Sequence, residues 1–205
     1  TGVNGAGVPQ FSANPGGAPA NAAVAAARLG ANTAFWGKVG DDAFGAYLRR
    51  VLKDNGVDAS GLRTGSQPTT MAIVSVDEAG ERSFQFLRGA DRDICPEEVD
   101  EDAVLRTKIL HFGSVSLTAG MSRSATIFAA RTAHKNGGLV SYDPNYLPAL
   151  WANQAEAAEW MTIPLPLVDI IKLAEEELPL LTGTSGLEEG SRLLEEQGVS
   201  LVLVT

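Results

Sequence analysis

The stretch Gly16-Gly17-Ala18-Pro19-Ala20-Asn21 runs directly into an alanine-rich segment, Ala22-Ala23-Val24-Ala25-Ala26-Ala27-Arg28-Leu29, that stops at Gly30. Glycine lets the backbone approach a ligand closely because it has no side chain. Alanine is a strong helix former, and Gly30 suits the C-terminal end of a helix. These residues predict a glycine loop that leads into a helix at about 20–29, with an anion-attracting N-terminal end. A tight turn before a buried helix accounts for the same pattern.

The composition limits the classes of partner. The chain of 205 residues is 44% hydrophobic, and 25 acidic against 16 basic residues give a net charge of −9. An acidic surface repels nucleic acid and anionic membranes, and no apolar run reaches the roughly 18 residues of a membrane-spanning helix. We therefore expect no nucleic acid and no membrane as partner. The single cysteine, Cys95, excludes an internal disulfide and indicates a reducing, cytoplasmic location.

Apolar segments alternate with helical patterns from about residue 96 onward. Four segments are expected to be strands: 108–112, 139–142, 168–173 and 201–204. Helices are expected among them, at about 122–136, 152–161, 175–182 and 187–197. Apolar strands separated by helices are typical of a parallel sheet covered on both faces. The sequence therefore predicts a doubly wound α/β domain.

The earlier part of the chain differs in character. The segment 34–36 suits a short strand, and Asp41 and Asp42 suit the N-terminus of the helix that follows them. Farther on, 70–76 and 82–88 flank a turn that contains glycine, so they are expected to pair as a β-hairpin.

Side chains alternate between the two sides of a strand, so Phe84, Phe86 and Arg88 share one side of the second arm. The hairpin is therefore predicted to form a small flap at about 66–90. Exposed sheet edges and aromatic residues invite pairing, so we expect a homodimer formed through the flaps.

Ligands of doubly wound sheets bind beyond the carboxyl ends of the strands. Four loops are expected at that rim: 39–42, 111–114, 143–145 and 174–177. The rim is polar and acidic, with few fixed cations, and candidate functional residues are sought there.

Several blocks, in order, resemble those of one enzyme family. Gly16 to Asn21, with Ala23, Gly30 and Gly40 at their offsets, is similar to the first signature of the phosphofructokinase-B, or ribokinase-like, sugar kinases. Further blocks resemble the family's Gly-Asp-Asp-x-Phe-Gly turn, its lid hairpin and two later motifs: 37–45, 81–88, 141–145 and 172–178. Residues 18–21 together with 143–145 are most similar to the fructokinases, and the likeness covers essentially the whole chain.

The resemblance implies a ribokinase-like, three-layer, doubly wound and mainly parallel sheet with a small β-sheet lid. Residues 1–205 are then one α/β domain, incomplete at both ends, with a lid formed by about 1–15 and 66–90. The family's N-terminal strand is missing, and its catalytic aspartate, in a Gly-Ala-Gly-Asp block, is expected beyond Thr205. We therefore expect no catalytic residue in this stretch, and a polypeptide of these residues alone is expected to be inactive.

The resemblance also implies ATP-dependent phosphorylation of a sugar hydroxymethyl group, with ATP and Mg²⁺ as cofactors. The first hypothesis is a fructokinase that forms fructose 6-phosphate. The alternatives are another sugar or nucleoside kinase, acting on keto-deoxy-gluconate, ribose, tagatose or adenosine, or a catalytically inactive sugar-binding relative. A dinucleotide-binding dehydrogenase is disfavoured, because no evident strand precedes the glycines and no Gly-x-Gly-x-x-Gly opens a helix.

By resemblance, Gly16, Gly17 and Asn21 contact the sugar, Phe86 covers it and Arg88 makes a polar contact. The alternative for Asn21 is a helix cap. For the two flap residues it is a solvated hairpin face. Phe84 is an alternative to Phe86 as the lining residue, and packing against a partner subunit is a further alternative for Phe84.

Asp143 and Asn145 end a strand around Pro144, which forces an extended turn and aims both side chains across the rim. Ordinary turn chemistry is the alternative. No arginine follows in 146–148, although a site for an acidic sugar would use a bidentate arginine there. The sequence therefore favours a neutral sugar such as fructose.

Glu177 aligns with the acid of the family's Asn-x-x-Glu block, which implies that it helps to hold magnesium through water. The block's asparagine is replaced by Ala174. A solvated acidic helix start, shared with Glu175 and Glu176, is the alternative.

Overall fold

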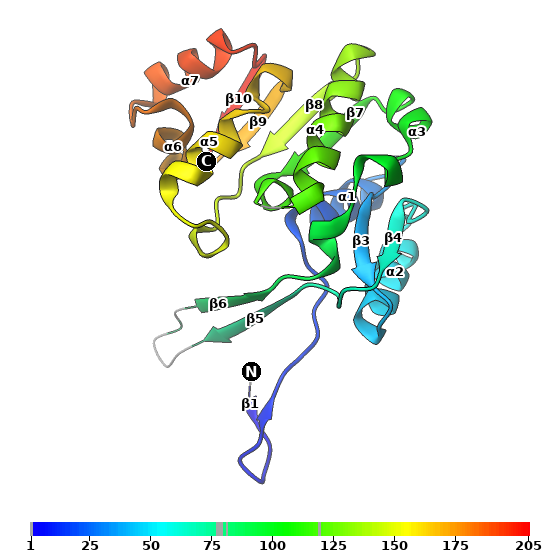
Figure 1. Cartoon of the computed structure of the whole chain (residues 1–205). Helices are drawn as coiled ribbons and strands as arrows, with labels where there is room; N and C mark the ends of the chain where they lie inside the picture. Colours follow the sequence, from blue (N-terminus) through cyan, green and yellow to red (C-terminus); the bar gives the residue numbers. More distant parts are fainter. Residues whose placement is uncertain (1, 77–79, 81, 119) are drawn as a thin grey trace.

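The structure is a computed structural model that describes residues 2–76, 80, 82–118 and 120–205. At its centre is a sheet of four parallel strands in the order β10-β9-β8-β7 (Figure 1). The strands are β7 Ile109–Gly113, β8 Leu139–Asp143, β9 Ile170–Leu173 and β10 Leu201–Val204. Each contains an apolar run that was predicted to be a strand, and the parallel order confirms the α/β class.

One face of this sheet packs under helices. These are α4 Gly120–Lys135, α5 Gln154–Thr162, α6 Leu178–Thr182 and α7 Leu187–Glu196. Alternate strand residues point beneath them, so that Val140, Tyr142 and Ile171 are 0% exposed. The ring of Tyr142 stacks on that of Phe112, with the centroids 4.6 Å apart. This apolar core fixes the positions of the strand ends, where the candidate residues lie.

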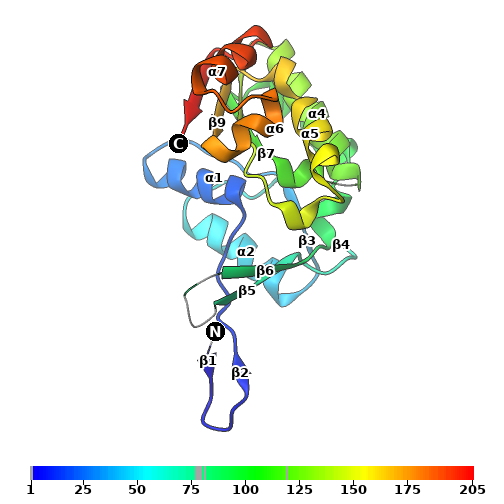
Figure 2. The same ribbon diagram turned by 90° about the vertical axis from the view of Figure 1, so that its left-hand side faces the viewer.

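The opposite face is covered only in part by the described residues. Helix α1 Ala18–Arg28 lies against β7, on the other side of that strand from α4 (Figure 2). Leu139, Leu201 and Leu203 on the same face remain 44%, 47% and 45% exposed. The expected cover on both faces is therefore present at β7, and no described helix provides it over β10.

A smaller α/β unit precedes the main sheet. Its parallel strands, β3 Gly37–Gly40 and β4 Leu62–Gly65, pair with each other and are joined through α2 Ala43–Asp54. The strand expected at 34–36 is wrong, since the structure has only an isolated bridge there, at Ala34. Trp36 packs on Gly61 instead, because a Cβ at Gly61 would lie 2.4 Å from the indole ring.

The predicted flap is an antiparallel hairpin of β5 Met71–Val76 and β6 Arg82–Leu87, which we call the lid. Figure 1 shows it projecting from the body of the molecule. The turn residues 77–79 and 81 lie outside the described residues, so their conformation stays a prediction.

A second, short hairpin near the N-terminus is formed by β1 Gly2–Val3 and β2 Pro9–Gln10 (Figure 2). The described strands of the two hairpins pair within each hairpin and not between them. A single lid built from 1–15 and 66–90 therefore stays a prediction.

Short helical turns complete the chain. They are η1 Ala90–Asp93, η2 Pro96–Glu98, α3 Glu101–Leu105, η3 Ser114–Leu117, η4 Pro148–Leu150, η5 Leu165–Leu167 and η6 Glu175–Glu177. Among the described helices, none has the length and apolar character that crossing a membrane requires. Turn η3 follows β7 directly and η4 begins five residues after the end of β8, so both lie at the rim.

Candidate functional site

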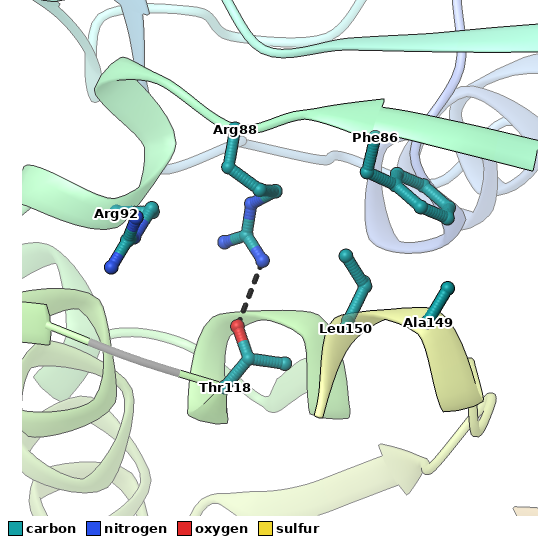
Figure 3. A pocket seen from close by; sticks show the side chains of 6 residues that line it. All are labelled: Phe86, Arg88, Arg92, Thr118, Ala149 and Leu150. Atoms are coloured by element: carbon teal, nitrogen blue, oxygen red, sulfur yellow. Dashed lines mark hydrogen bonds between the residues drawn. The ribbon is translucent and has the colours of Figure 1, made fainter. Parts of the chain in front are cut away.

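A cavity of about 240 Å³ lies where the lid meets the turns that follow β7 and β8 (Figure 3). Its lining residues come from the lid, from the segments 68–70 and 88–92 that flank it, which we call the lid root, and from the turns after β7 and β8. They are Phe86, Arg88, Arg92, Thr118, Ala149 and Leu150. The aromatic and aliphatic side chains make one side of the cavity apolar. The two guanidinium groups and the hydroxyl make the other side basic and polar.

Arg88 is fixed within this cavity by three polar groups. Its Nη1 donates to Thr118 Oγ1 over 2.8 Å, and its Nη2 forms an ion pair with Asp91 Oδ2 at 2.7 Å. Nη2 also donates to the carbonyl oxygen of Val115 at 3.4 Å. The side chain is 11% exposed. Arg88 is therefore a preorganised hydrogen-bonding group and not part of a solvated hairpin face.

The two aromatic residues of β6 have different surroundings. Their rings stack, with centroids 6.2 Å apart, which confirms that Phe84 and Phe86 share one side of the strand. Phe84 is 48% exposed, whereas Phe86 lines the cavity and lies above Ala149 and Leu150 (Figure 3). Phe86 is thus the aromatic residue that can cover a ligand there.

Asp42 ties the root of the lid to the start of α2. Its carboxylate accepts hydrogen bonds from Thr69 N at 2.8 Å, Thr69 Oγ1 at 2.7 Å and Gly45 N at 2.8 Å. These hydrogen bonds, with that from the Thr69 N–H first, lower the pKa of Asp42. The bond from Gly45 confirms Asp42 as a helix-start residue. The link to the lid root was not predicted, because Thr69 is distant in sequence.

Gly16, Gly17 and Asn21 lie at the start of α1, which begins at Ala18. Gly17 is the N-cap, and its φ of 105° is a conformation that favours glycine. Asn21 is therefore not the helix cap, and its side chain is exposed without a hydrogen bond among the described residues. A Cβ at Gly113 would lie 3.7 Å from Cγ of Pro19, which places the start of α1 at the carboxyl end of β7.

Asp143 and Asn145, at the carboxyl end of β8, differ in burial and in partners. Asp143 pairs in register with Gly113, and its Oδ2 lies 3.6 Å from Lys172 Nζ. Its Oδ1 is buried and has no hydrogen-bond partner among the described residues. Asn145 is exposed and has a φ of 45°, which asparagine tolerates better than most residues. A buried acceptor without a donor is a group that a substrate hydroxyl would satisfy.

Glu177 joins the turns that follow β8 and β9. Its Oε1 accepts a hydrogen bond from Tyr146 N, and its Oε2 accepts one from Ala174 N at 2.7 Å. The residue is 8% exposed. A solvated acidic helix start is therefore the wrong interpretation for Glu177, although it fits the exposed Glu175 and Glu176.

The structure gathers the predicted residues into two groups, linked by the segment 113–118. The start of α1 meets the turn of Asp143 at Gly113, and Phe86 and Arg88 meet Thr118. Four cavity residues were not predicted: Arg92, Thr118, Ala149 and Leu150. Thr118, Ala149 and Leu150 follow expected rim loops by a few residues, and Arg92 follows the flap, so a wider search around these segments would have found them.

The family model described as pfkB family carbohydrate kinase matches residues 3–205. The chain belongs to the pfkB family of carbohydrate kinases. One curated pfkB relative, Probable fructokinase-4 of Arabidopsis thaliana, is 40% identical over 210 residues, which are 100% of this chain and 64% of that protein. Fructokinase-1 of Zea mays is 42% identical over 191 residues, which are 92% of this chain and 59% of that protein.

Solved structures of pfkB proteins share the fold. The fructokinase of Vibrio cholerae O395 in its apo form is 37% identical, with a TM-score of 0.83 over 94% of this chain and 66% of that one. A putative ribokinase II of E. coli is 29% identical, with a TM-score of 0.84 over 92% of this chain and 61% of that one. The ribokinase-like α/β fold is thereby confirmed. This pfkB chain spans about three-fifths of the length of the curated relatives it matches.

Proposed function

We propose that the complete protein is a fructokinase, which transfers the γ-phosphoryl group of ATP to a hydroxymethyl oxygen of fructose and forms fructose 6-phosphate. The cavity beneath the lid is the main support for this proposal. Curated pfkB relatives of the chain are named fructokinases, which supports fructose as the sugar. A solved relative, the fructokinase of Vibrio cholerae O395, has a form with fructose, ADP and calcium ion bound.

Phosphoryl transfer depends mainly on positioning the reactants and on neutralising charge. In the proposal, the residues of this chain contribute to positioning by holding the sugar. In the proposal, Gly16 and Gly17 let the backbone approach the sugar hydroxyls. The amides of Asn21 and Asn145 both donate and accept hydrogen bonds, and Asp143 Oδ1 accepts one. A site built for each hydroxyl rejects analogues that lack it, which supplies the selectivity.

The lid supplies cover and a fixed donor group. Phe86 forms an apolar wall, and Arg88 presents the guanidinium that Thr118 and Asp91 hold in place. Enclosing the sugar in this way excludes water, which limits unproductive hydrolysis of ATP.

ATP is the proposed phosphoryl donor, as it is the nucleotide bound in a solved fructokinase of Xylella fastidiosa. We propose that Glu177 would hold magnesium through a water molecule bound to the ion. The ion would neutralise phosphate charge. No group of three His, Cys, Asp or Glu residues in the described part of the chain could hold a metal. Each oxygen of Glu177 accepts one N–H, which leaves lone pairs for a magnesium-bound water.

The substrate is tested with the complete protein in a coupled ADP assay. The panel contains fructose, ribose, tagatose, keto-deoxy-gluconate and adenosine. Fructose is expected to give the highest kcat/KM, and a lower rank for fructose contradicts the proposal. ADP production with none of the five contradicts it equally.

Asn21→Ala is expected to raise the KM for fructose by about tenfold, the usual effect of losing one good hydrogen bond, while the KM for ATP stays unchanged. The matched control is Asn32→Ala, whose exposed side chain lies beyond the end of α1. A rise confined to the KM for ATP would assign the glycine loop to the nucleotide instead.

One observation favours a second candidate, an acidic-sugar kinase. The sequence has no arginine at 146–148, but Arg92 lines the cavity beside Arg88 and pairs with no carboxylate among the described residues. A free guanidinium suits a carboxylate. In the panel, keto-deoxy-gluconate ranking above fructose would establish this candidate.

We also propose a homodimer formed through the lid, in a protein located in the cytoplasm. Apolar side chains of the lid stand in solvent, among them Val76 at 51% and Phe84 at 48% exposed. A strand edge with such side chains favours pairing with another chain. Sedimentation of a monomer at micromolar concentration would contradict the dimer.

A further inference from the structure

We propose that Arg123, near the start of α4, is a positioning residue for the sugar site. It holds the turn of residues 116–118, and that turn fixes Arg88 in the cavity beneath the lid. The proposal rests on the proposed function, because Arg88 is taken there to contact the sugar.

The turn between β7 and α4 is bound by side chains of α4. Arg123 donates from Nε to the carbonyl oxygen of Leu117 over 2.7 Å, and from Nη2 to that of Thr118 over 3.1 Å. Its neighbour Ser122 donates from Oγ to the carbonyl oxygen of Ser116 over 2.9 Å. Three successive carbonyl groups are thus satisfied by two adjacent residues. Moving the turn would strip these carbonyls of their donors, which is unfavourable.

The guanidinium of Arg123 is itself fixed from the other side. Its Cζ lies 3.4 Å from the centre of a ring of Trp160, on α5. The guanidinium is planar, and stacking on an indole fixes the plane in which its donors lie. Desolvation lowers the pKa of Arg123, and the charges of Glu156 and Glu159 oppose that shift. A lysine cannot reproduce this geometry, because its ammonium is a point charge without a planar fork.

Thr118 transmits the position of the turn to the lid. Its Oγ1 donates to the carbonyl oxygen of Val115 at 2.8 Å and accepts from Arg88 Nη1 at 2.8 Å, the contact drawn in Figure 3. The direction in which the hydroxyl accepts is therefore set by the turn. Arg88 Nε is buried without a partner in the described part of the chain, so this arginine depends on its Nη contacts. If Thr118 moved, Arg88 would keep its ion pair with Asp91 but lose the shorter of its two contacts with the rim, since the other, to the carbonyl oxygen of Val115, is 3.4 Å long.

The test is Arg123→Lys in the complete enzyme. The KM for fructose is expected to rise by about tenfold, because Arg88 loses one charge-assisted hydrogen bond, while the KM for ATP stays unchanged. The matched control is Arg131→Lys, on the same helix, where the side chain is exposed. A merely structural role for Arg123 would lower the melting temperature without separating the two KM values. Equal changes in both KM values, or no change in either, would overturn the proposal.

A double-mutant cycle tests the route through Thr118. If Arg123 acts through this residue, Arg123→Lys combined with Thr118→Val raises the KM for fructose no further than Thr118→Val alone. Multiplicative effects would show that Arg123 acts independently and would overturn the proposal.

A separate measurement distinguishes this proposal from the proposed function. If the wild-type enzyme phosphorylates no sugar of the panel, the proposed function fails. The link is then measured by urea unfolding of Arg123→Lys, Arg88→Lys and the double variant. Non-additive losses of stability support the link between the two arginines, and additive losses overturn it.

Discussion

The central sheet and the root of the lid are stabilised in opposite ways. On the covered face of β8 and β9, Val140, Tyr142 and Ile171 are fully buried and make apolar contacts. At the root of the lid, Asp42 and Arg88 are held by hydrogen bonds and an ion pair. The free energy gained by apolar burial is roughly proportional to the buried area and does not depend on direction, whereas hydrogen bonds fix positions and angles.

Because of this difference, stability can be changed in the sheet without changing selectivity. A substitution in the sheet should lower the free energy of unfolding without favouring one substrate over another. A substitution at the lid root should change the KM for the sugar as well as the free energy of unfolding. Substitutions at Ile171, Gly89 and Asp42 test this difference.

Ile171→Ala should cause the largest loss of stability, about 4 kcal/mol of unfolding free energy, because it leaves a cavity in a site with 0% exposure. The KM for fructose of the folded fraction should not change. Urea unfolding measures the first quantity and initial rates the second.

The matched control is Ile163→Ala, since Ile163 is 45% exposed just after α5. It should cost about 1 kcal/mol or less. Equal losses from Ile163 and Ile171 would mean that the sheet is not the main source of stability.

Gly89→Ala should disturb the lid root, with a smaller loss of about 2–3 kcal/mol. A Cβ at Gly89 would lie 1.9 Å from the carbonyl oxygen of Pro68, so the two ends of the lid could not keep their present approach. Because Arg88 is adjacent, the KM for the sugar should rise as well. Gly5→Ala is the control, since an added Cβ meets nothing within 4 Å there. An unchanged KM for the sugar in Gly89→Ala would contradict the role assigned to the lid root.

The same contrast explains which features the sequence could predict. The strands of the central sheet were predicted to within one or two residues, because burial requires apolar runs such as 109–112. Strands β3 and β4 were missed because they contain glycine, lysine and arginine, as in Gly37–Gly40. Their pairing depends on neighbours in space rather than on an apolar pattern.

The candidate site was predictable only in part. Alternation along one strand placed Phe86 and Arg88 on the same side, and the structure confirms it. The partners of Arg88, Thr118 and Asp91, belong to turns with no periodic pattern. Such partners are brought together by tertiary packing, which no local spacing encodes.

Asp42 offers the finest test of the contrast, because one carboxylate serves both α2 and the lid root. Asp42→Ala should cost about 1–2 kcal/mol, the range for a lost helix cap, and Asp41→Ala, at the exposed neighbour, should cost little. Hydrogen bonds to the carboxylate lower the pKa of Asp42 in the folded state. Its contribution is therefore complete above the pKa of an unfolded aspartate, about 3.9, and is lost as the pH falls through the lower folded value. The stability gap between wild type and Asp42→Asn should thus shrink as the pH falls below about 4. A gap that stays constant down to acid pH would mean that the charge of Asp42 contributes nothing at the lid root.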